Sequence, residues 1–353
     1  MKEYDLLLAS IAPVDREWEN KAWERLSSQI RPRGSLGQLE KTAARLAAIK
    51  RSLDLDFSRK IIYVMAGDHG IAAEGVSAYP QEVTAQMVFS FSQGWASINV
   101  LARHAGATVR VVDCGIIGDI PPEWNVIDGK IGRGTASIAK GPAMTREEAV
   151  KAVLLGAKLV RGACVKEGFT LIGTGDMGIG NTTPSAAIIC AFSGKPVAQL
   201  AGRGTGIGDG ALEKKIAAIE TALKVNRPDP QDPLDVLSKV GGYEIAALAG
   251  AVLGAAAARV PIVCDGLIAT AGALLACRMA PSCADYLFVS HQSVEPGHLS
   301  MCELMGTQPI LNLEMRLGEG TGAALAMNIV EASAKVLVEC KTFAEAGVTD
   351  TGH

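Results

Sequence analysis

The chain has 353 residues, of which 48% are hydrophobic and only 5% aromatic, which suits one large α/β domain with an appendage, or two domains. The formal net charge of -3, without a basic cluster, excludes the general positive field of a nucleic-acid-binding protein. The eight cysteines form no C-x-x-C pair, and this favours reduced core residues over a disulfide or zinc framework.

The candidates for a targeting or membrane-spanning segment are weak. The N-terminal apolar run is short and flanked by acids, which makes a poor signal peptide. The longest apolar segment, residues 245–260, contains Arg259 and is too short and too rich in Ala and Gly to span a bilayer. We therefore expect a cytoplasmic protein without a membrane span.

Two helical pieces are predicted between residues 15 and 53, separated by the sequence RPRG at 31–34. Strand and helix patterns then alternate. Strands are predicted at residues 60–66, 108–112, 169–172, 261–264 and 285–289, and helices at 80–104, from Thr145, from Pro184, after 264, and at 322–338.

This alternation predicts an α/β protein with a parallel, doubly wound, Rossmann-like sheet covered on both faces. We expect residues 56–319 to form the large catalytic domain. Residues 1–55 and 320–353 supply the remaining helices, which we expect to form a smaller helical domain.

The stretch FTLIGTGDMGIGNTTP, residues 169–184, predicts a buried strand, a glycine-rich turn and a helix. Gly173, Gly175 and Gly178 satisfy G-x-G-x-x-G, but no acid follows about 20 residues later, so a dinucleotide site is disfavoured. No Lys follows the last glycine, so the stretch is not a P-loop. It suits one phosphate, or alternatively a turn that only lets strand and helix pack.

A second glycine-rich stretch, residues 194–210, fits neither helix nor strand periodicity, and we interpret it as a functional loop. Every predicted strand also runs into polar or glycine-rich residues. Because ligands of open α/β sheets bind at the carboxyl ends of the strands, these segments predict one crevice, although Asp and Gly also terminate strands for structural reasons. The segments are 67–70, 113–115, 173–176, 265–266 and 290–291.

Several acids and histidines raise the question of a metal, namely Asp68, His69, Asp265, His291, Glu295 and His298. Pro296 and Gly297 break any helix that would align the last three, and no H-E-x-x-H motif occurs. No G-x-S-x-G elbow and no Asp-Asp signature for a pyrophosphorylated sugar are present either. We expect neither a metal nor another cofactor.

Glu319, between Gly318 and Gly320, is the most suggestive acid. A partly buried carboxylate at this point would accept a proton. The alternative is that Glu319 interacts with N–H groups at a helix end. The residues leave both interpretations open.

Taken in order, seven segments resemble the nicotinate-nucleotide:dimethylbenzimidazole phosphoribosyltransferase family nearly from end to end. They are RPRGSLGQLE, MAGDHGIAAEGVSAYPQEVTAQM, GDMGIGNTTP, DVLSKVGGYE, VCDGLIATAGALLA, SHQSVEPGH and MRLGEGTGAALAMNIV. The resemblance implies a parallel sheet in a large domain, a small domain from N- and C-terminal helices, and a homodimer. It also implies transfer of the phosphoribosyl group of nicotinate mononucleotide to dimethylbenzimidazole, which makes the lower-ligand nucleotide of cobalamin.

The same resemblance implies roles for individual residues. Glu319 is the general base, and Asp176 acts near the anomeric carbon. The remaining positions are expected to bind the phosphate and ribose (Gly178, Ile179, Gly180, Asn181, Thr182, Thr183, Gly202, Arg203, Gly204, Lys215, Gly318 and Gly320) or to form the base pocket (Tyr79, Gln86, Met87 and Met177).

Two positions depart from the family pattern. Asp176 stands where a Glu is expected, and Tyr79 stands where a small Ser is expected. The acceptor is therefore open among benzimidazoles, purines and phenolic bases. Two rival functions also remain, a dinucleotide-dependent oxidoreductase and a non-catalytic nucleotide-binding protein on the same fold.

Overall fold

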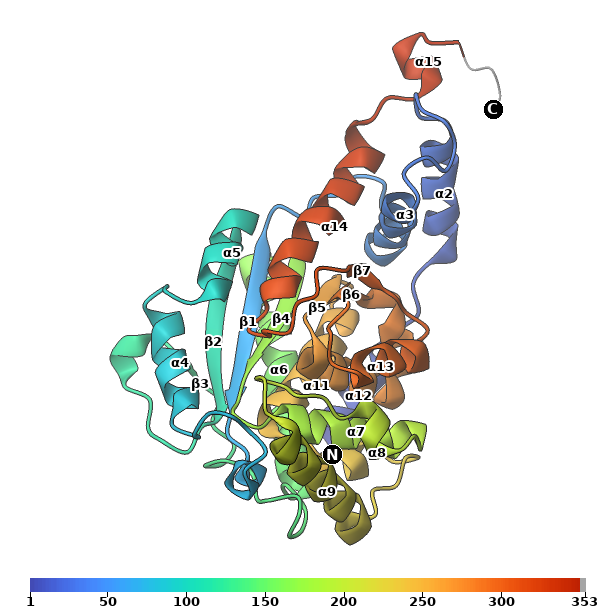
Figure 1. Ribbon diagram of the computed structural model, residues 1–353. Coiled ribbons are helices and arrows are strands. Elements are labelled where there is room, and N and C mark those ends of the chain that lie inside the picture. Colours follow the sequence, from blue (N-terminus) through green and yellow to red (C-terminus); the bar gives the residue numbers. More distant parts are fainter. Residues whose placement is uncertain (350–353) are drawn as a thin grey trace.

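The computed structural model describes residues 1–349 (Figure 1). Its centre is a seven-stranded, wholly parallel sheet in the order β3-β2-β1-β4-β5-β6-β7, which confirms the predicted α/β class. The strands are β1 (Lys60–Gly67), β2 (Ala107–Gly115), β3 (Ile127–Asp128), β4 (Leu171–Met177), β5 (Ile262–Cys264), β6 (Leu287–His291) and β7 (Pro309–Leu311).

The chain runs from β1 outward to β2 and β3, and then returns to place β4 on the other side of β1. This reversal makes a topological switch point between β1 and β4, which is where open α/β sheets bind ligands. Every residue of β1 is buried, as expected for a central strand covered on both faces.

Helices cover both faces of the sheet. α5 (Ser97–Ala105) and α14 (Thr321–Glu339) pack on one face, whereas α6 (Arg146–Glu167), α11 (Tyr243–Ala257) and α12 (Leu267–Met279) cover the other. The other helices of the α/β region are α4 (Val83–Ser92), α7 (Thr182–Ser193), α8 (Val197–Leu200), α9 (Asp209–Asn226), α10 (Pro233–Val240) and α13 (Gly297–Met305).

Glycine and alanine let α6 and α11 approach closely. A Cβ on Gly156 would lie 1.9 Å from the carbonyl oxygen of Ala247, and one on Gly250 would lie 1.9 Å from that of Val153. The low aromatic content therefore reflects helices packed nearly backbone to backbone.

The N-terminal helices α2 (Arg16–Ser27) and α3 (Gln38–Lys50) pack beside the C-terminal half of α14, near α15 (Phe343–Ala346) (Figure 1). Gln29 Nε2 donates to the Val336 carbonyl at 2.7 Å, and Arg25 Nε donates to that of Leu337 at 2.8 Å, so both satisfy the end of α14. By contrast, α1 (Lys2–Ala9) packs on α6 and α11. The division into two domains remains a proposal, and residues 350–353 of the expected small domain lie outside the described residues.

Two local predictions are corrected. The helix expected over residues 80–104 is two helices, α4 and α5, because Gly94 adopts a left-handed conformation (φ +75°) that ends the first. The strand expected at 169–172 starts at Leu171 and continues to Met177, so Gly173 and Gly175 belong to β4 and not to the turn. In addition, the segment 194–210, which was interpreted as a loop without helix or strand periodicity, contains the short helix α8, and α9 begins near its end at Asp209.

One helix among the described residues, α14, is long and apolar enough to cross a membrane by length and composition. However, 56% of its apolar window is buried, and it packs on β4, β5 and β6 and against α3 and α5. In this fold α14 is a core helix.

Candidate active site

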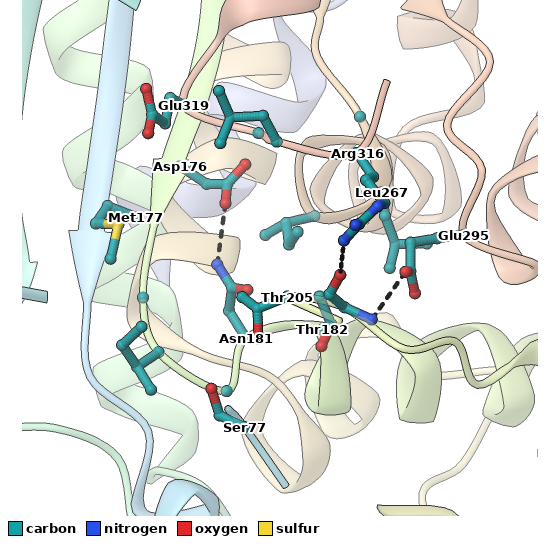
Figure 2. Close-up of a pocket in the computed structure, with 18 of the residues that line it drawn as sticks. Ser77, Asp176, Met177, Asn181, Thr182, Thr205, Leu267, Glu295, Arg316 and Glu319 are labelled. Atoms are coloured by element: carbon teal, nitrogen blue, oxygen red, sulfur yellow. Dashed lines mark hydrogen bonds between the residues drawn. The ribbon is translucent and has the colours of Figure 1, made fainter. Parts of the chain in front are cut away.

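A cavity of about 390 Å³ opens at the carboxyl edge of the sheet, beside the switch point (Figure 2). This volume suits a ligand of nucleotide size. Its wall consists of the segment 76–87, the end of β4, the turn before α7, the loop after α8, the residues that follow β5, the end of β6 with the loop after it, and the segment that follows β7. Segments far apart in the sequence therefore form one site.

Most of the predicted site residues border this cavity. They are Tyr79, Met87, Asp176, Met177, Gly178, Ile179, Gly180, Asn181, Thr182, Gly204, Gly318 and Glu319.

The other predicted residues lie outside the cavity wall. Gln86 is on the exposed side of α4, and Arg203 bonds to the Ile207 carbonyl and to Asp209. Thr183 and Lys215 are buried behind the wall, Gly202 packs on Glu295, and Gly320 packs on Ile62 and Ile98.

The strand-end acids are divided between the site and the scaffold. Asp68 accepts the Ile117 N–H and Asp113 accepts the Ile116 N–H, both at 2.9 Å, while His69 pairs with Glu244 at 2.7 Å. These side chains stabilise the loops after the strands and do not border the cavity. They fit the alternative that polar residues at strand ends have a structural role.

Sequence reasoning did not assign several lining residues, including Ser77, Ser293, Arg316 and Leu317, whereas Thr205 lies in the loop 202–206 that was expected to bind the phosphate and ribose. Arg316 lies in the same MRLGEG segment as Glu319. A positive charge so close to a suspected base could have been used to predict that Arg316 belongs to the site. Glu295 was considered only as a metal ligand, whereas His291 was also expected at the crevice as a strand-end residue, and both line the cavity.

Glu319 lies in a strained turn. Gly318, Glu319 and Gly320 have φ values of +83°, +64° and +99°, and a non-glycine residue in this region costs roughly 1–3 kcal/mol. Asp265 fixes the turn by accepting N–H bonds from Gly320 and Gly322, both at 2.8 Å. Such local strain is typical of functional sites, because the surrounding fold must maintain it.

The Glu319 side chain is buried, with only 7% exposed, and its Oε2 accepts a long 3.4 Å bond from the Ile98 N–H in the first turn of α5. Burial raises the pKa of this carboxyl. The contact to a helix end and the features of a proton acceptor therefore coexist. A raised pKa brings the group closer to neutral pH, which suits general base catalysis.

Asp176 is the last residue but one of β4 and lies beside the same turn. Its Oδ2 accepts from Asn181 Nδ2 at 2.9 Å, while its buried Oδ1 has no partner among the described residues. Burial, with the nearby carboxyls of Asp265 and Glu244, raises its pKa well above the usual value. The neutral form is thereby favoured, and this argues against Asp176 as a negative charge beside a developing cation.

The turn before α7 has free donors. The N–H groups of Gly180 and Thr182 make no hydrogen bond within residues 1–349, and they lie at the N-terminal end of α7, where the helix dipole favours an anion. Lys215 Nζ donates to Thr182 Oγ1 at 2.7 Å and to the Gly202 carbonyl at 2.9 Å. The buried ammonium group of Lys215 thus adds positive charge next to the turn, on the side away from the cavity.

Gly178 has a second constraint. A Cβ there would lie 2.3 Å from the carbonyl oxygen of Gly67, so the residue is needed for the close approach of β1 and β4. Replacing Gly178 by valine would disturb this packing first, and the variant would not isolate phosphate binding.

Glu295 and Arg316 hold the glycine-rich loop after α8 from its two sides (Figure 2). Glu295 Oε1 accepts the Gly204 N–H at 2.8 Å, and Arg316 Nη1 donates to the Gly204 carbonyl at 3.0 Å. Gly204 has a φ of +52°. The N–H and the carbonyl of Gly204 are therefore both fixed at the cavity edge, beside Thr182.

The phosphoribosyltransferase family model matches residues 11–348. The chain belongs to this phosphoribosyltransferase family. A nicotinate-nucleotide–dimethylbenzimidazole phosphoribosyltransferase of Syntrophobacter fumaroxidans is 70% identical over the full length of both chains. One of that name from Geobacter metallireducens is 57% identical, covering 97% of this chain and 96% of the relative.

The crystal structure of CobT from Thermus thermophilus matches this phosphoribosyltransferase with a TM-score of 0.91 and 46% identity. The match covers 94% of this chain and 99% of that one. The family resemblance inferred from the sequence is confirmed, and the chain is an enzyme of the phosphoribosyltransferase class.

Within residues 1–349 of the phosphoribosyltransferase, no group of three or more His, Cys, Asp or Glu residues is arranged to hold a metal ion. The histidines and acids considered from the sequence are engaged separately, for example His298 with Thr270 at 3.1 Å. Independence from metals and other cofactors stays a prediction.

Proposed function

We propose that this phosphoribosyltransferase transfers the 5-phosphoribosyl group of nicotinate mononucleotide to dimethylbenzimidazole or a related lower-ligand base. The products are α-ribazole 5′-phosphate and nicotinate, in cobamide biosynthesis in the cytoplasm. The names of the relatives from Syntrophobacter fumaroxidans and Geobacter metallireducens, which match over at least 96% of their length, support this activity. The observation that carries the proposal is a buried acid of raised pKa, Glu319, in the same cavity wall as the unpaired N–H donors of the α7 turn.

In this reaction a benzimidazole nitrogen forms a bond to the anomeric carbon while the bond from that carbon to the pyridinium nitrogen breaks. The bonding electrons return to the pyridine ring, which leaves as nicotinate. Attack from the opposite face inverts the β-nucleotide to the α-product. The other benzimidazole nitrogen loses its proton, and Glu319 is the proposed acceptor of that proton.

The protein's own groups have separate tasks. The N–H groups of Gly180 and Thr182 are suited to the phosphate, because the α7 dipole and the charge of Lys215 favour an anion there. Nicotinate is a good leaving group because its ring nitrogen becomes neutral on departure. The reaction therefore needs no separate activation of a pyrophosphate.

The proposed base pocket is largely apolar, with Val76, Val83, Met87 and Met177 in its wall. Such a surface favours a planar, methylated base through burial of apolar area. Tyr79 is 53% exposed at the rim, and its phenol adds a polar group to this pocket. The identity of the acceptor among benzimidazoles, purines and phenolic bases remains for experiment.

The test is incubation of the full chain with nicotinate mononucleotide and a panel of bases, with mass analysis of the products. We expect an α-ribotide of at least one base and one nicotinate per transfer, at an equal rate in excess chelator. A chelator-sensitive rate restored by a divalent ion would contradict metal independence. Tight binding of NAD without any transfer would instead favour a dinucleotide enzyme.

A further inference from the structure

Three polar atoms in the cavity wall are buried without a hydrogen-bond partner in the described part of the chain. They are Asp176 Oδ1, His291 Nε2 and Glu295 Oε2. An unpaired buried polar group is costly, so native proteins rarely leave one without a reason. Their position indicates that a bound ligand supplies the missing partners.

Glu295 is the most constrained of the three. Its side chain is only 7% exposed, and Oε1 is held by the Gly204 N–H at 2.8 Å. Its own N–H donates to Ser293 Oγ at 3.3 Å, just before α13 begins. One carboxylate oxygen is thus fixed to the protein, while the other has no partner.

Neighbouring groups leave this second oxygen free. A Cβ on Gly202 would lie 2.1 Å from Oε2, so only glycine at position 202 gives the carboxylate its space. Lys215 Nζ donates to Thr182 Oγ1 and the Gly202 carbonyl and forms no ion pair with Glu295 within residues 1–349, although the charge of Glu295 is close enough to favour the charged form of Lys215. Glu295 Oε2 therefore keeps room for a donor group of the ligand.

A carboxylate oxygen can only accept a hydrogen bond, so its partner must be a donor. In nicotinate mononucleotide the phosphate and the nicotinate carboxylate are anionic acceptors, and the 2′ and 3′ hydroxyls of the ribose are the donors. The N–H of an acceptor base is assigned to Glu319, which Figure 2 shows on the opposite side of the cavity from Glu295. The ribose hydroxyls are therefore the donor groups of the ligand that suit Glu295 Oε2.

We propose that Glu295 Oε2 accepts a hydrogen bond from a ribose hydroxyl of the donor nucleotide and makes the enzyme selective for ribosyl over deoxyribosyl donors. This inference rests on the proposed function. Glu295 Oε1 also accepts the N–H of Gly204, whose carbonyl accepts from Arg316. The same side chain would therefore bind the sugar and fix the loop beside the phosphate turn.

The test compares kcat/KM for nicotinate mononucleotide and for its 2′-deoxy and 3′-deoxy analogues. The wild-type enzyme should disfavour at least one analogue by roughly 10- to 100-fold, the usual effect of a hydrogen bond to a charged group. In Glu295→Gln, whose amide oxygen can still accept from Gly204, this ratio should fall by roughly tenfold. Asp176→Asn tests the rival carboxylate, whose unpaired oxygen lies in the same wall, and it should keep the wild-type ratio if Glu295 is the residue that binds the hydroxyl.

Equal use of all three donors by the wild-type enzyme would overturn the proposal without any variant. It would also be overturned if Glu295→Gln lost activity equally with all donors, as expected of a residue that only orders the loop, or if Asp176→Asn abolished the ratio instead. Transfer from nicotinate mononucleotide by the wild-type enzyme tests the proposed function separately. A failure of the sugar preference is thereby distinguished from a failure of the activity.

Discussion

Glu319 combines two features that are each unfavourable in a folded chain, a left-handed backbone and a buried carboxyl group. The fold maintains both, through the flanking glycines and the bonds from Gly320 and Gly322 to Asp265. A side chain held in this way is already oriented before the acceptor base binds.

Replacing Glu319 by Gln should lower kcat by roughly 10²–10⁴ with little change in substrate affinity, because the amide keeps the size of the side chain but cannot take a proton. Steady-state kinetics with dimethylbenzimidazole measure the loss. An N-alkylated benzimidazole, which has no proton to lose on attack, is the control acceptor and should suffer least. Equal losses for both acceptors would show that the proton goes elsewhere.

The lowered pKa of Lys215 leads us to expect that donor binding depends on pH. Burial lowers its pKa to about 8, so the ammonium charge that favours the phosphate is present below that pH and is lost above it. We expect kcat/KM for nicotinate mononucleotide to fall as the pH rises through about 8. The raised pKa of Glu319 adds an opposite limb on the acid side, because the base must be deprotonated.

Lys215→Met separates these two limbs. The variant should bind the donor roughly 10- to 100-fold more weakly at neutral pH, since a charge-assisted contribution is lost, and its profile should lack the alkaline limb. The acid limb should persist. An alkaline limb near pH 8 that survives in the variant would assign that titration to another group.

Tyr79 lines the base pocket and not the phosphate turn. Tyr79→Ser should therefore change the ranking of acceptor bases, by about 1–3 kcal/mol in discrimination, and leave donor affinity nearly unchanged. Tyr79→Phe separates the effect of the hydroxyl from that of the ring. Competition assays with paired bases measure the ranking, and identical rankings in all three proteins would argue against a role in acceptor choice.

At the scale of elements, β4 and the turn before α14 are in direct contact. A Cβ on Gly175 would lie 2.2 Å from the carbonyl oxygen of Glu319, and one on Gly173 would lie 2.7 Å from Met327 Cε. The glycines that resemble a nucleotide fingerprint thus let α14 and its preceding turn lie against the strand. Their contribution to the site is indirect, because they position the proposed base.

Gly175→Ala should displace the Glu319 turn and lower kcat by up to about 100-fold, with a loss of stability of about 1–3 kcal/mol from overpacking. Gly162→Ala is the matched control, since position 162 lies inside α6 with no atom within 4 Å of a new Cβ. This control should stabilise the protein by about 0.5–1 kcal/mol. Thermal unfolding and kinetics test both, and an unchanged kcat in Gly175→Ala would mean that the turn tolerates the shift.

At the scale of the whole molecule, α14 links the proposed active site to the N-terminal helices. It begins immediately after Gly320, crosses one face of the sheet, and ends between Arg25 and Gln29. The first and last parts of the chain therefore support the same helix that follows the proposed base.

We expect the enzyme to be a homodimer, as the family resemblance implies. Light scattering should then give twice the chain mass of 36.7 kDa. Leu313 and Leu317, which precede the Glu319 turn, are exposed apolar residues of the kind that protein–protein interfaces cover. We expect them to contact the second subunit of the homodimer. A mass of a single chain over a wide concentration range would contradict this expectation.

The sequence by itself determined the α/β class, most of the strands and the edge at which the cavity lies. These features depend on local patterns, namely β-rich apolar runs followed by Asp and Gly, together with a general rule for parallel sheets. The short strands β3 and β7 were missed because two or three residues carry no periodicity and, unlike the equally short β5, neither strand is fully buried. The break between α4 and α5 depends on a single glycine, which helices also tolerate in their interior.

Only the tertiary structure decided which residues share the wall and in what state. Gly175 serves the Glu319 turn, Asp176 acquires a raised pKa from burial and surrounding carboxyls, and Glu295 keeps one oxygen without a partner among the described residues. Each property depends on the approach of segments that are distant in the chain. Sequence periodicity reports the conformation and burial of one segment, whereas desolvation and hydrogen-bond pairing are set by whatever the fold brings beside it.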